Sequence, residues 1–206
     1  MFTSNRLDKT LKLSGAAPAP ELFDQLQAMY CESGRYYHTD QHVSECLKAL
    51  DQHAQLADRP IEIELAIWFH DAVYDSRRAD NEEQSAALAK QALSALGAAS
   101  DSIDRIESMI LATKSHQAIG RDAELMLDID LGILGQPAAV FESYDQAIRR
   151  EYAWVPEEQY LNGRTAVLQS FLDRPTIYHT QVFREAYEDQ ARRNLESRIR
   201  QMADQL

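Results

Sequence analysis

Apolar side chains recur every three or four residues along most of the chain, which is the spacing of a buried helical face. No stretch shows the sustained alternation of apolar and polar residues that is typical of strands. The 206 residues include only seven glycines and six prolines, too few for a turn-rich β fold. The pattern therefore predicts an all-α protein, a single-domain helical bundle of about eight or nine helices.

Prolines and short polar side chains mark the expected helix starts. Pro20 and Pro60 each precede an apolar stripe and suit the first helical turn, and Thr39 is expected to cap a helix between them. Further helices are expected to open at Asp80, Asp101, Pro137, Pro156 and Thr180. Residues 1–19 are interpreted as an N-terminal lead-in and residues 20–206 as one domain.

The overall charge narrows the classes of partner. The net charge is −12 at pH 7, so the long-range field repels nucleic acid and anionic membranes but permits a small anionic substrate held locally. No apolar run approaches the length of a membrane span, and the N-terminus lacks the apolar core of a signal peptide. The two cysteines, Cys31 and Cys46, are expected to be reduced and partly buried. We therefore expect a cytoplasmic protein, monomeric or homodimeric.

One polar interruption lies inside the most apolar segment of the chain, residues 65–75. This segment ends in the adjacent pair His70-Asp71, followed by Asp75. A charged group in a buried helix is costly unless it is paired or binds a metal. A lone His-Asp pair is more often a surface pair or an ordinary buried hydrogen bond. Asp75 follows Asp71 by four residues, so both are expected on one side of a helix.

Three other stretches place polar residues where a helix core should be apolar: His38 with His42, His116, and Asp128 with Asp130. Each has an ordinary explanation. His42 could be a surface residue, and His116 lies at an expected helix end, where a cation is favourable. Taken together, imidazole and carboxylate groups suit a transition metal such as Zn, Mn, Fe or Co.

In chain order, His42, the pair His70-Asp71 and Asp130 read as H…HD…D. This order resembles the signature of the HD superfamily of metal-dependent phosphohydrolases. Residues 37–42 resemble the Tyr-His-Asn-x-x-His segment of cyclic-nucleotide phosphodiesterases, and residues 128–131 resemble an Asp-Ala-Asp-x-Leu segment. Over roughly residues 20–200 the chain resembles a bacterial group of predicted metal-dependent HD phosphohydrolases. Further matches to that group are Asn81-Glu82-Glu83-x-Ser85-Ala86, Arg149-Arg150-Glu151-Tyr152 and Gly163-Arg164.

The resemblance implies an HD-type fold with one or two divalent ions per chain, drawn from Mn, Fe, Co, Ni, Zn or Mg. The implied metal ligands are His42, His70, Asp71 and Asp130. Asp130 is preferred to Asp128 because it matches the second Asp of the Asp-x-Asp segment. His116 is a candidate for a second metal or for a substrate contact.

Supporting roles follow from the same resemblance and from chemistry. His38 resembles the general acid of the phosphodiesterases, and its alternative is a hydrogen-bonded loop histidine. Asp75 is expected to orient water or a ligand imidazole. Four basic residues are candidates to hold substrate phosphate, although any one of them could be a surface ion-pair residue. They are Lys114, Arg149, Arg150 and Arg164.

The leading functional prediction is a metal-dependent phosphohydrolase, a phosphatase or phosphodiesterase, that cleaves a small phosphoester, with a nucleotide favoured. Alarmone hydrolases resemble this chain but carry His-Asp-x-x-Glu-Asp, and Tyr74 stands here in place of that Glu. The departure disfavours guanosine alarmones as substrates. Two alternatives stay open at this point: an HD-fold di-iron oxygenase, and a non-catalytic nucleotide-binding regulatory module.

Overall fold

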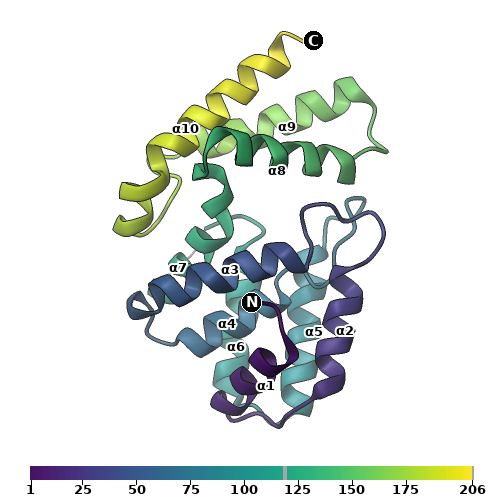
Figure 1. Ribbon diagram of the computed structural model, residues 1–206, viewed down its shortest axis with the longest axis vertical. Coiled ribbons are helices and arrows are strands. Elements are labelled where there is room, and N and C mark those ends of the chain that lie inside the picture. The colour runs from purple at the N-terminus through teal and green to yellow at the C-terminus, as the bar shows by residue number, and fades with distance from the viewer. Residues whose placement is uncertain (118–119, 206) are drawn as a thin grey trace. The chain divides into compact units, whose positions relative to one another are not determined.

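The computed structural model describes residues 1–117 and 120–205. These residues form ten α-helices and two short 3-10 helices, and no strand occurs among them (Figure 1). The predicted all-α helical class is therefore confirmed. The chain divides into two compact units, Met1–Ile129 and Asp130–Leu206, which are described in turn. The predicted division into a lead-in, residues 1–19, and one domain, residues 20–206, stays a prediction.

The first unit is organised around one buried helix, α4. Its elements are α1 (Ser4–Leu13), α2 (Pro20–Tyr30), α3 (Asp40–His53), η1 (Ala54–Leu56), α4 (Pro60–Phe69), α5 (Asn81–Ala95), α6 (Ser100–Ala112) and all but the last residue of α7 (Arg121–Asp130). Helices α1, α3, α5 and α6 all contact α4. Seven of the ten residues of α4 are buried, and its two glutamates, Glu62 and Glu64, pair with Arg105 and Arg6.

The segment predicted as a lead-in, residues 1–19, contains helix α1. Thr3 caps this helix by accepting a hydrogen bond from the Arg6 amide at 3.4 Å. Leu7 and Leu11 are fully buried, and the ring of Phe2 lies 4.6 Å from that of Trp68 on α4. The N-terminal segment is therefore part of the core of this unit.

Most helix starts were predicted correctly, with two differences in detail. Pro20 and Pro60 are the first residues of α2 and α4, and Thr39 occupies the N-cap of α3, although its side chain makes no capping hydrogen bond. The prediction that Asp101 caps a helix is wrong, because α6 already begins at Ser100. The Asp101 carboxylate instead pairs with Arg105 one turn later, at 3.0 Å.

The second unit comprises η2 (Leu131–Gly135), α8 (Ala138–Glu151), α9 (Glu157–Leu172) and α10 (Gln181–Ala203). Helix α10 packs on η2 and α9. Its Asn194 donates hydrogen bonds from Nδ2 to the carbonyls of Leu134 and Gln136, both at 2.8 Å. Gly135 lies against Tyr187, so there is no space for a Cβ at this position.

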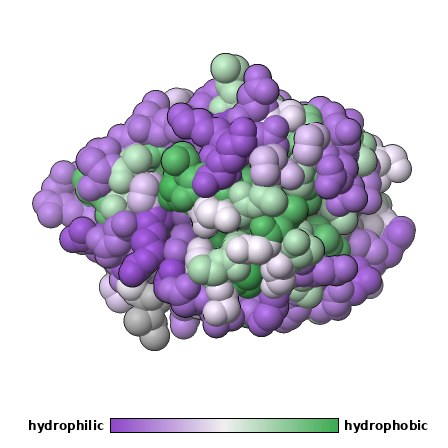
Figure 2. Space-filling model, turned by 90° about the horizontal axis from the view of Figure 1, so that it is seen from below, coloured by the Kyte–Doolittle hydropathy of each residue, from purple (hydrophilic) through white to green (hydrophobic). Residues whose placement is uncertain are grey.

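The surface is largely hydrophilic. On the face shown in Figure 2, hydrophilic residues surround a more apolar central area. Among the described residues, no helix combines the length and the apolar character that a bilayer crossing requires.

Candidate metal centre

Two buried histidines approach each other from different parts of the first unit. His42 lies in the first turn of α3 and is 3% exposed. His70 directly follows the last residue of α4 and is 2% exposed. Because α4 is buried on every side, the residue that caps its C-terminal end is also held inside the protein. The two Nε2 atoms lie 3.2 Å apart.

Asp71 completes a set of three donor atoms. Its Oδ2 lies 3.0 Å from Nε2 of His70 and 3.6 Å from Nε2 of His42. The ligand atoms of these three residues all lie within 4.8 Å of one another. The structure thus brings together three of the four metal ligands that the sequence predicted.

A backbone hydrogen bond orients the His70 ring. Its Nδ1 lies 2.9 Å from the Ile67 carbonyl oxygen, which can only accept, so Nδ1 carries the proton. In a neutral ring the lone pair is then on Nε2, the atom that faces His42 and Asp71. Metal-binding histidines commonly have their ring orientation fixed in this way.

The spacing of the three donors suits one small cation. With metal–ligand bonds of about 2.1 Å, neighbouring ligand atoms in a tetrahedral or octahedral shell lie about 3.0–3.4 Å apart. The observed separations of 3.0, 3.2 and 3.6 Å are close to this range. The buried His and Asp residues could therefore hold a divalent metal ion.

The electrostatics favour an anionic Asp71. Burial raises the pKa of this carboxyl group, but the neighbouring rings of His70, His38 and His42 outweigh burial and hold its pKa below the ordinary range. The group is therefore ionised at neutral pH and offers a negatively charged oxygen to a cation.

Arg35 holds the backbone at Asp71 and Ala72, beside the donor set. The guanidinium is buried; its Nη1 donates to the carbonyls of Asp71 at 2.6 Å and His38 at 3.3 Å, and its Nη2 donates to Ala72 at 2.8 Å. Sequence reasoning missed this residue. The available signal was its position three residues before His38, in a segment already under consideration.

Helix α5 braces the same loop from the other side. Ser85 Oγ accepts a hydrogen bond from the Val73 amide at 3.1 Å and lies 3.2 Å from the Val73 carbonyl, to which it donates. Asn81 exchanges two hydrogen bonds with the backbone of Asp75, both at 3.0 Å. Ser85 and Asn81 belong to the segment 81–86 that resembles the HD phosphohydrolases. Their role in holding the backbone of residues 73 and 75 was not predicted from the sequence.

The prediction that Asp71 and Asp75 lie on one side of a helix is wrong. Helix α4 ends at Phe69, so Asp71 and Asp75 are not related by a helical turn. Asp75 is exposed, and its Oδ1 accepts a hydrogen bond from the Arg77 amide at 2.9 Å. This bond stabilises a local turn. The expected role in orienting water or a ligand imidazole loses its structural basis.

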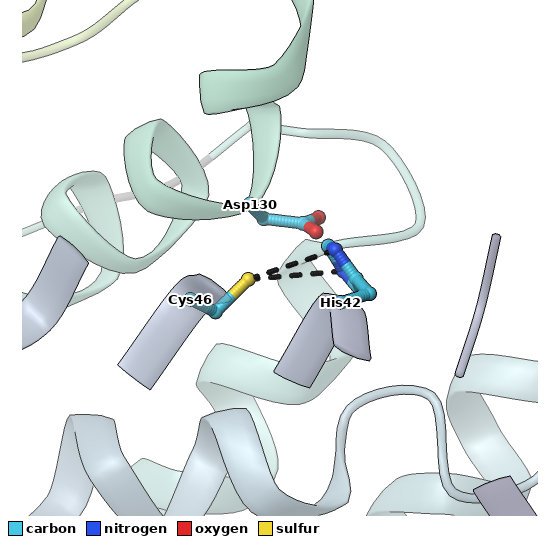
Figure 3. Close-up of side chains that lie close together, drawn as sticks. All are labelled: His42, Cys46 and Asp130. Atoms are coloured by element: carbon cyan, nitrogen blue, oxygen red, sulfur yellow. Dashed lines mark hydrogen bonds between the residues drawn. The ribbon is translucent and has the colours of Figure 1, made fainter. Parts of the chain in front are cut away.

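His38 and Cys46 flank His42. The half-buried His38 ring stacks on Tyr74 with centroids 4.1 Å apart, and its centroid lies 6.3 Å from that of His42. Cys46 is one turn along α3, with Sγ 3.8 Å from both ring nitrogens of His42 (Figure 3). Sequence reasoning treated Cys46 only as a partly buried thiol, although its spacing of four residues from His42 was visible.

The predicted roles of Asp130 as a metal ligand and of His116 as a second-metal or substrate contact stay predictions. Asp130, also drawn in Figure 3, is half-buried; it is the last residue of α7 and the first of the second unit. His116 follows α6 in the left-handed region, with φ of 50°, and is half-buried. A left-handed residue after a helix is a common way to end it, so the His116 backbone has a local structural role.

The predicted phosphate-binding residues have protein partners. Lys114 donates to the Ala79 carbonyl at 2.6 Å and pairs with Glu83. In the second unit, Arg149 pairs with Glu157 at 2.7 Å and Arg164 pairs with the buried Asp145 at 3.0 Å. Arg150 is also on α8 and is exposed. Their role toward substrate stays a prediction.

Comparisons with protein-family models, with curated proteins and with solved structures gave no match. The resemblance to HD phosphohydrolases therefore rests on the residues of this chain.

Proposed function

We propose that the chain is a metal-dependent phosphohydrolase that cleaves a small phosphoester, with a nucleotide as the favoured class. The observation that carries the proposal is the convergence of His42 Nε2, His70 Nε2 and Asp71 Oδ2 at 3.0 to 3.6 Å. Asp130 is the fourth ligand that the resemblance implies. The bound cation would polarise a phosphoryl oxygen and make water more acidic.

The protein groups in this proposal have distinct tasks. His42 and His70 are neutral donors, whereas Asp71 and the implied ligand Asp130 would each contribute one negative charge. Together they would balance the charge of a divalent ion, so an anionic substrate would be held chiefly by direct coordination of a phosphoryl oxygen. Arg35 keeps the Asp71 backbone in place through the hydrogen bonds described above.

His38 is the proposed general acid. It is half-buried beside the donor set, so it can reach both substrate and solvent. Its stacking on Tyr74 restricts the orientation of the ring. A protonated imidazole there would give its proton to the leaving oxygen of the ester.

The experiment starts from chelated protein reconstituted separately with Mn, Fe, Co, Ni, Zn or Mg. Metal stoichiometry is measured by elemental analysis, and phosphate release or diester cleavage is followed on a nucleotide panel. His42→Ala and His70→Ala should lose the bound metal and the turnover, while far-UV circular dichroism keeps the helical signal. The matched control is His53→Ala, at the end of the same helix as His42, which should keep both.

Three outcomes decide between the functions. Stoichiometric metal in both His42→Ala and His70→Ala would exclude the metal centre. Metal binding without hydrolysis of any panel member would exclude nucleotides as the substrate class, and oxygen consumption with iron would then favour the oxygenase. His38→Asn should lower kcat without changing metal affinity, and unchanged kinetics would remove its role as the acid.

A further inference from the structure

We propose that the second unit contains a separate binding site for a small phosphomonoester, in the cavity between α8 and α10. This cavity has a volume of about 460 Å³, within the usual range of ligand pockets. The residues of its wall that carry the argument are Phe141, Asp145, Arg149, Arg150 and Arg198. The proposal does not depend on the metal centre.

A cluster of charged side chains that includes the wall residues Asp145 and Arg198 carries an excess of positive charge. Asp145, with a side chain 5% exposed, accepts hydrogen bonds from Nε of Arg164 at 3.0 Å and Nε of Arg198 at 2.6 Å. Two guanidinium groups against one carboxylate leave a net charge of +1 in this trio. Uncompensated charge away from water is costly, so an anion at the cavity wall would be stabilised.

Arg198 is the residue best placed to bind that anion. Its Nε is held by Asp145, its side chain is 19% exposed, and it forms part of the cavity wall. Among the described residues, its two terminal nitrogens have no hydrogen-bond partner. A guanidinium fixed at Nε can present its terminal N–H groups to two oxygens of one phosphate.

The rest of the wall adds charge and an apolar surface. Arg149 is held by Glu157 and lies 4.5 Å over the Tyr160 ring, whereas Arg150 is exposed. The wall also contains the exposed Glu142. Because Glu157 already pairs with Arg149, the excess positive charge comes from the cluster of Arg164, Arg198 and Asp145. Phe141, 4% exposed, provides apolar surface for the organic part of the ligand.

Phosphate suits this wall better than a carboxylate. A phosphomonoester presents three terminal oxygens and up to two negative charges at neutral pH, which can engage more than one arginine. The chain as a whole carries a net charge of −12, whereas the residues around this cavity carry an excess of positive charge. It indicates recognition of an anion at short range.

The test measures binding to the full chain by isothermal titration calorimetry. Adenosine 5′-monophosphate and inorganic phosphate are the probes, and adenosine is the uncharged control. EDTA is present throughout, and the titrations are repeated in His70→Ala, so that binding at the metal centre cannot contribute. We expect the two phosphate probes to bind, adenosine to bind much more weakly, and added salt to weaken binding.

The variants separate the proposed site from general charge effects. Arg198→Gln should weaken binding of adenosine 5′-monophosphate by about ten- to hundredfold. Arg200→Gln makes the same charge change on the same helix, at a side chain that is 70% exposed and pairs with Glu196; its affinity should equal that of the wild type. Arg150→Gln, outside the buried trio, should lower affinity about threefold or more.

The binding results either support the phosphate site or overturn it. No binding of either phosphate probe at millimolar concentration in EDTA would overturn the proposal. Equal affinities of Arg198→Gln, Arg200→Gln and the wild type would also overturn it. If Arg198→Gln fails to fold because Asp145 loses a partner, Arg150→Gln decides: reduced affinity supports the site, and unchanged affinity refutes it.

Discussion

Replacing Arg35 by Met should destabilise the first unit and also weaken metal binding at the proposed centre. The guanidinium is 3% exposed at its side chain and makes two short hydrogen bonds, to the carbonyls of Asp71 and Ala72 at 2.6 and 2.8 Å. Met occupies a similar volume but donates no hydrogen bond. The substitution therefore removes the support of the backbone that carries Asp71 while leaving the packing largely filled.

The size of the effect follows from those two bonds. Hydrogen bonds to charged groups contribute about 1.5–3 kcal/mol each, so their loss should cost about 3–6 kcal/mol. The third bond, to His38 at 3.3 Å, is longer, and the pair with the exposed Glu32 adds little. In a chain of this size each kcal/mol lowers the melting temperature by about 2–4 °C, so a decrease of about 6–24 °C is expected.

The assay can isolate the first unit. The chain has two tryptophans: Trp68 is fully buried in the first unit, and Trp154 is 48% exposed in the second. In a Trp154→Phe background, fluorescence during heating therefore reports on the surroundings of Trp68. Metal affinity, measured by titration calorimetry on the same protein, should fall about 10- to 100-fold.

The control is Arg121→Met, at an exposed side chain 3.4 Å from Asp58. It should change the free energy of unfolding by less than about 0.5 kcal/mol. If Arg35→Met lowers the melting temperature no more than Arg121→Met, the Arg35 hydrogen bonds do not stabilise the loop. If stability falls but metal affinity is unchanged, Arg35 supports the fold without positioning Asp71.

Two further predictions concern packing and thiol chemistry. Gly135→Ala should destabilise the second unit by about 1–3 kcal/mol, because its Cβ would overlap Tyr187; chemical unfolding followed through Trp154 checks this, and a stability equal to that of the wild type would contradict the close contact. Cys31 is exposed and Cys46 is buried, so a thiol reagent should label one cysteine quickly and the other only after unfolding; two fast thiols would contradict the burial of Cys46.

The sequence predicted those features that depend on local pattern. Helical periodicity and the prolines at Pro20 and Pro60 were sufficient for the fold class and several helix starts. These are properties of neighbouring residues, so the amino-acid order records them. The pairing of His42 with His70 and Asp71 joins distant segments, and it was implied by the resemblance to the HD pattern rather than by periodicity.

The missed features depend on contacts between distant segments. Arg35 and Ser85 act through the backbone of residues 71–73, so no side-chain pairing pattern revealed them. The prediction for Asp75 failed because α4 ends at Phe69 without a glycine or proline to mark its end. The arginine-rich cavity was missed because its wall combines residues of α8 and α10, which α9 separates along the chain.

The bracing of residues 71–75 by Arg35 and by α5 has a consequence for the order of assembly. The donors are not carried by one continuous helix: His42 is on α3, and His70 and Asp71 follow α4. An unfolded chain would therefore hold no preformed chelate, and tight ion capture would have to wait until the core around α4 had formed. The metal ion would therefore bind late in folding, and it would stabilise only those chains whose interior is already correctly packed.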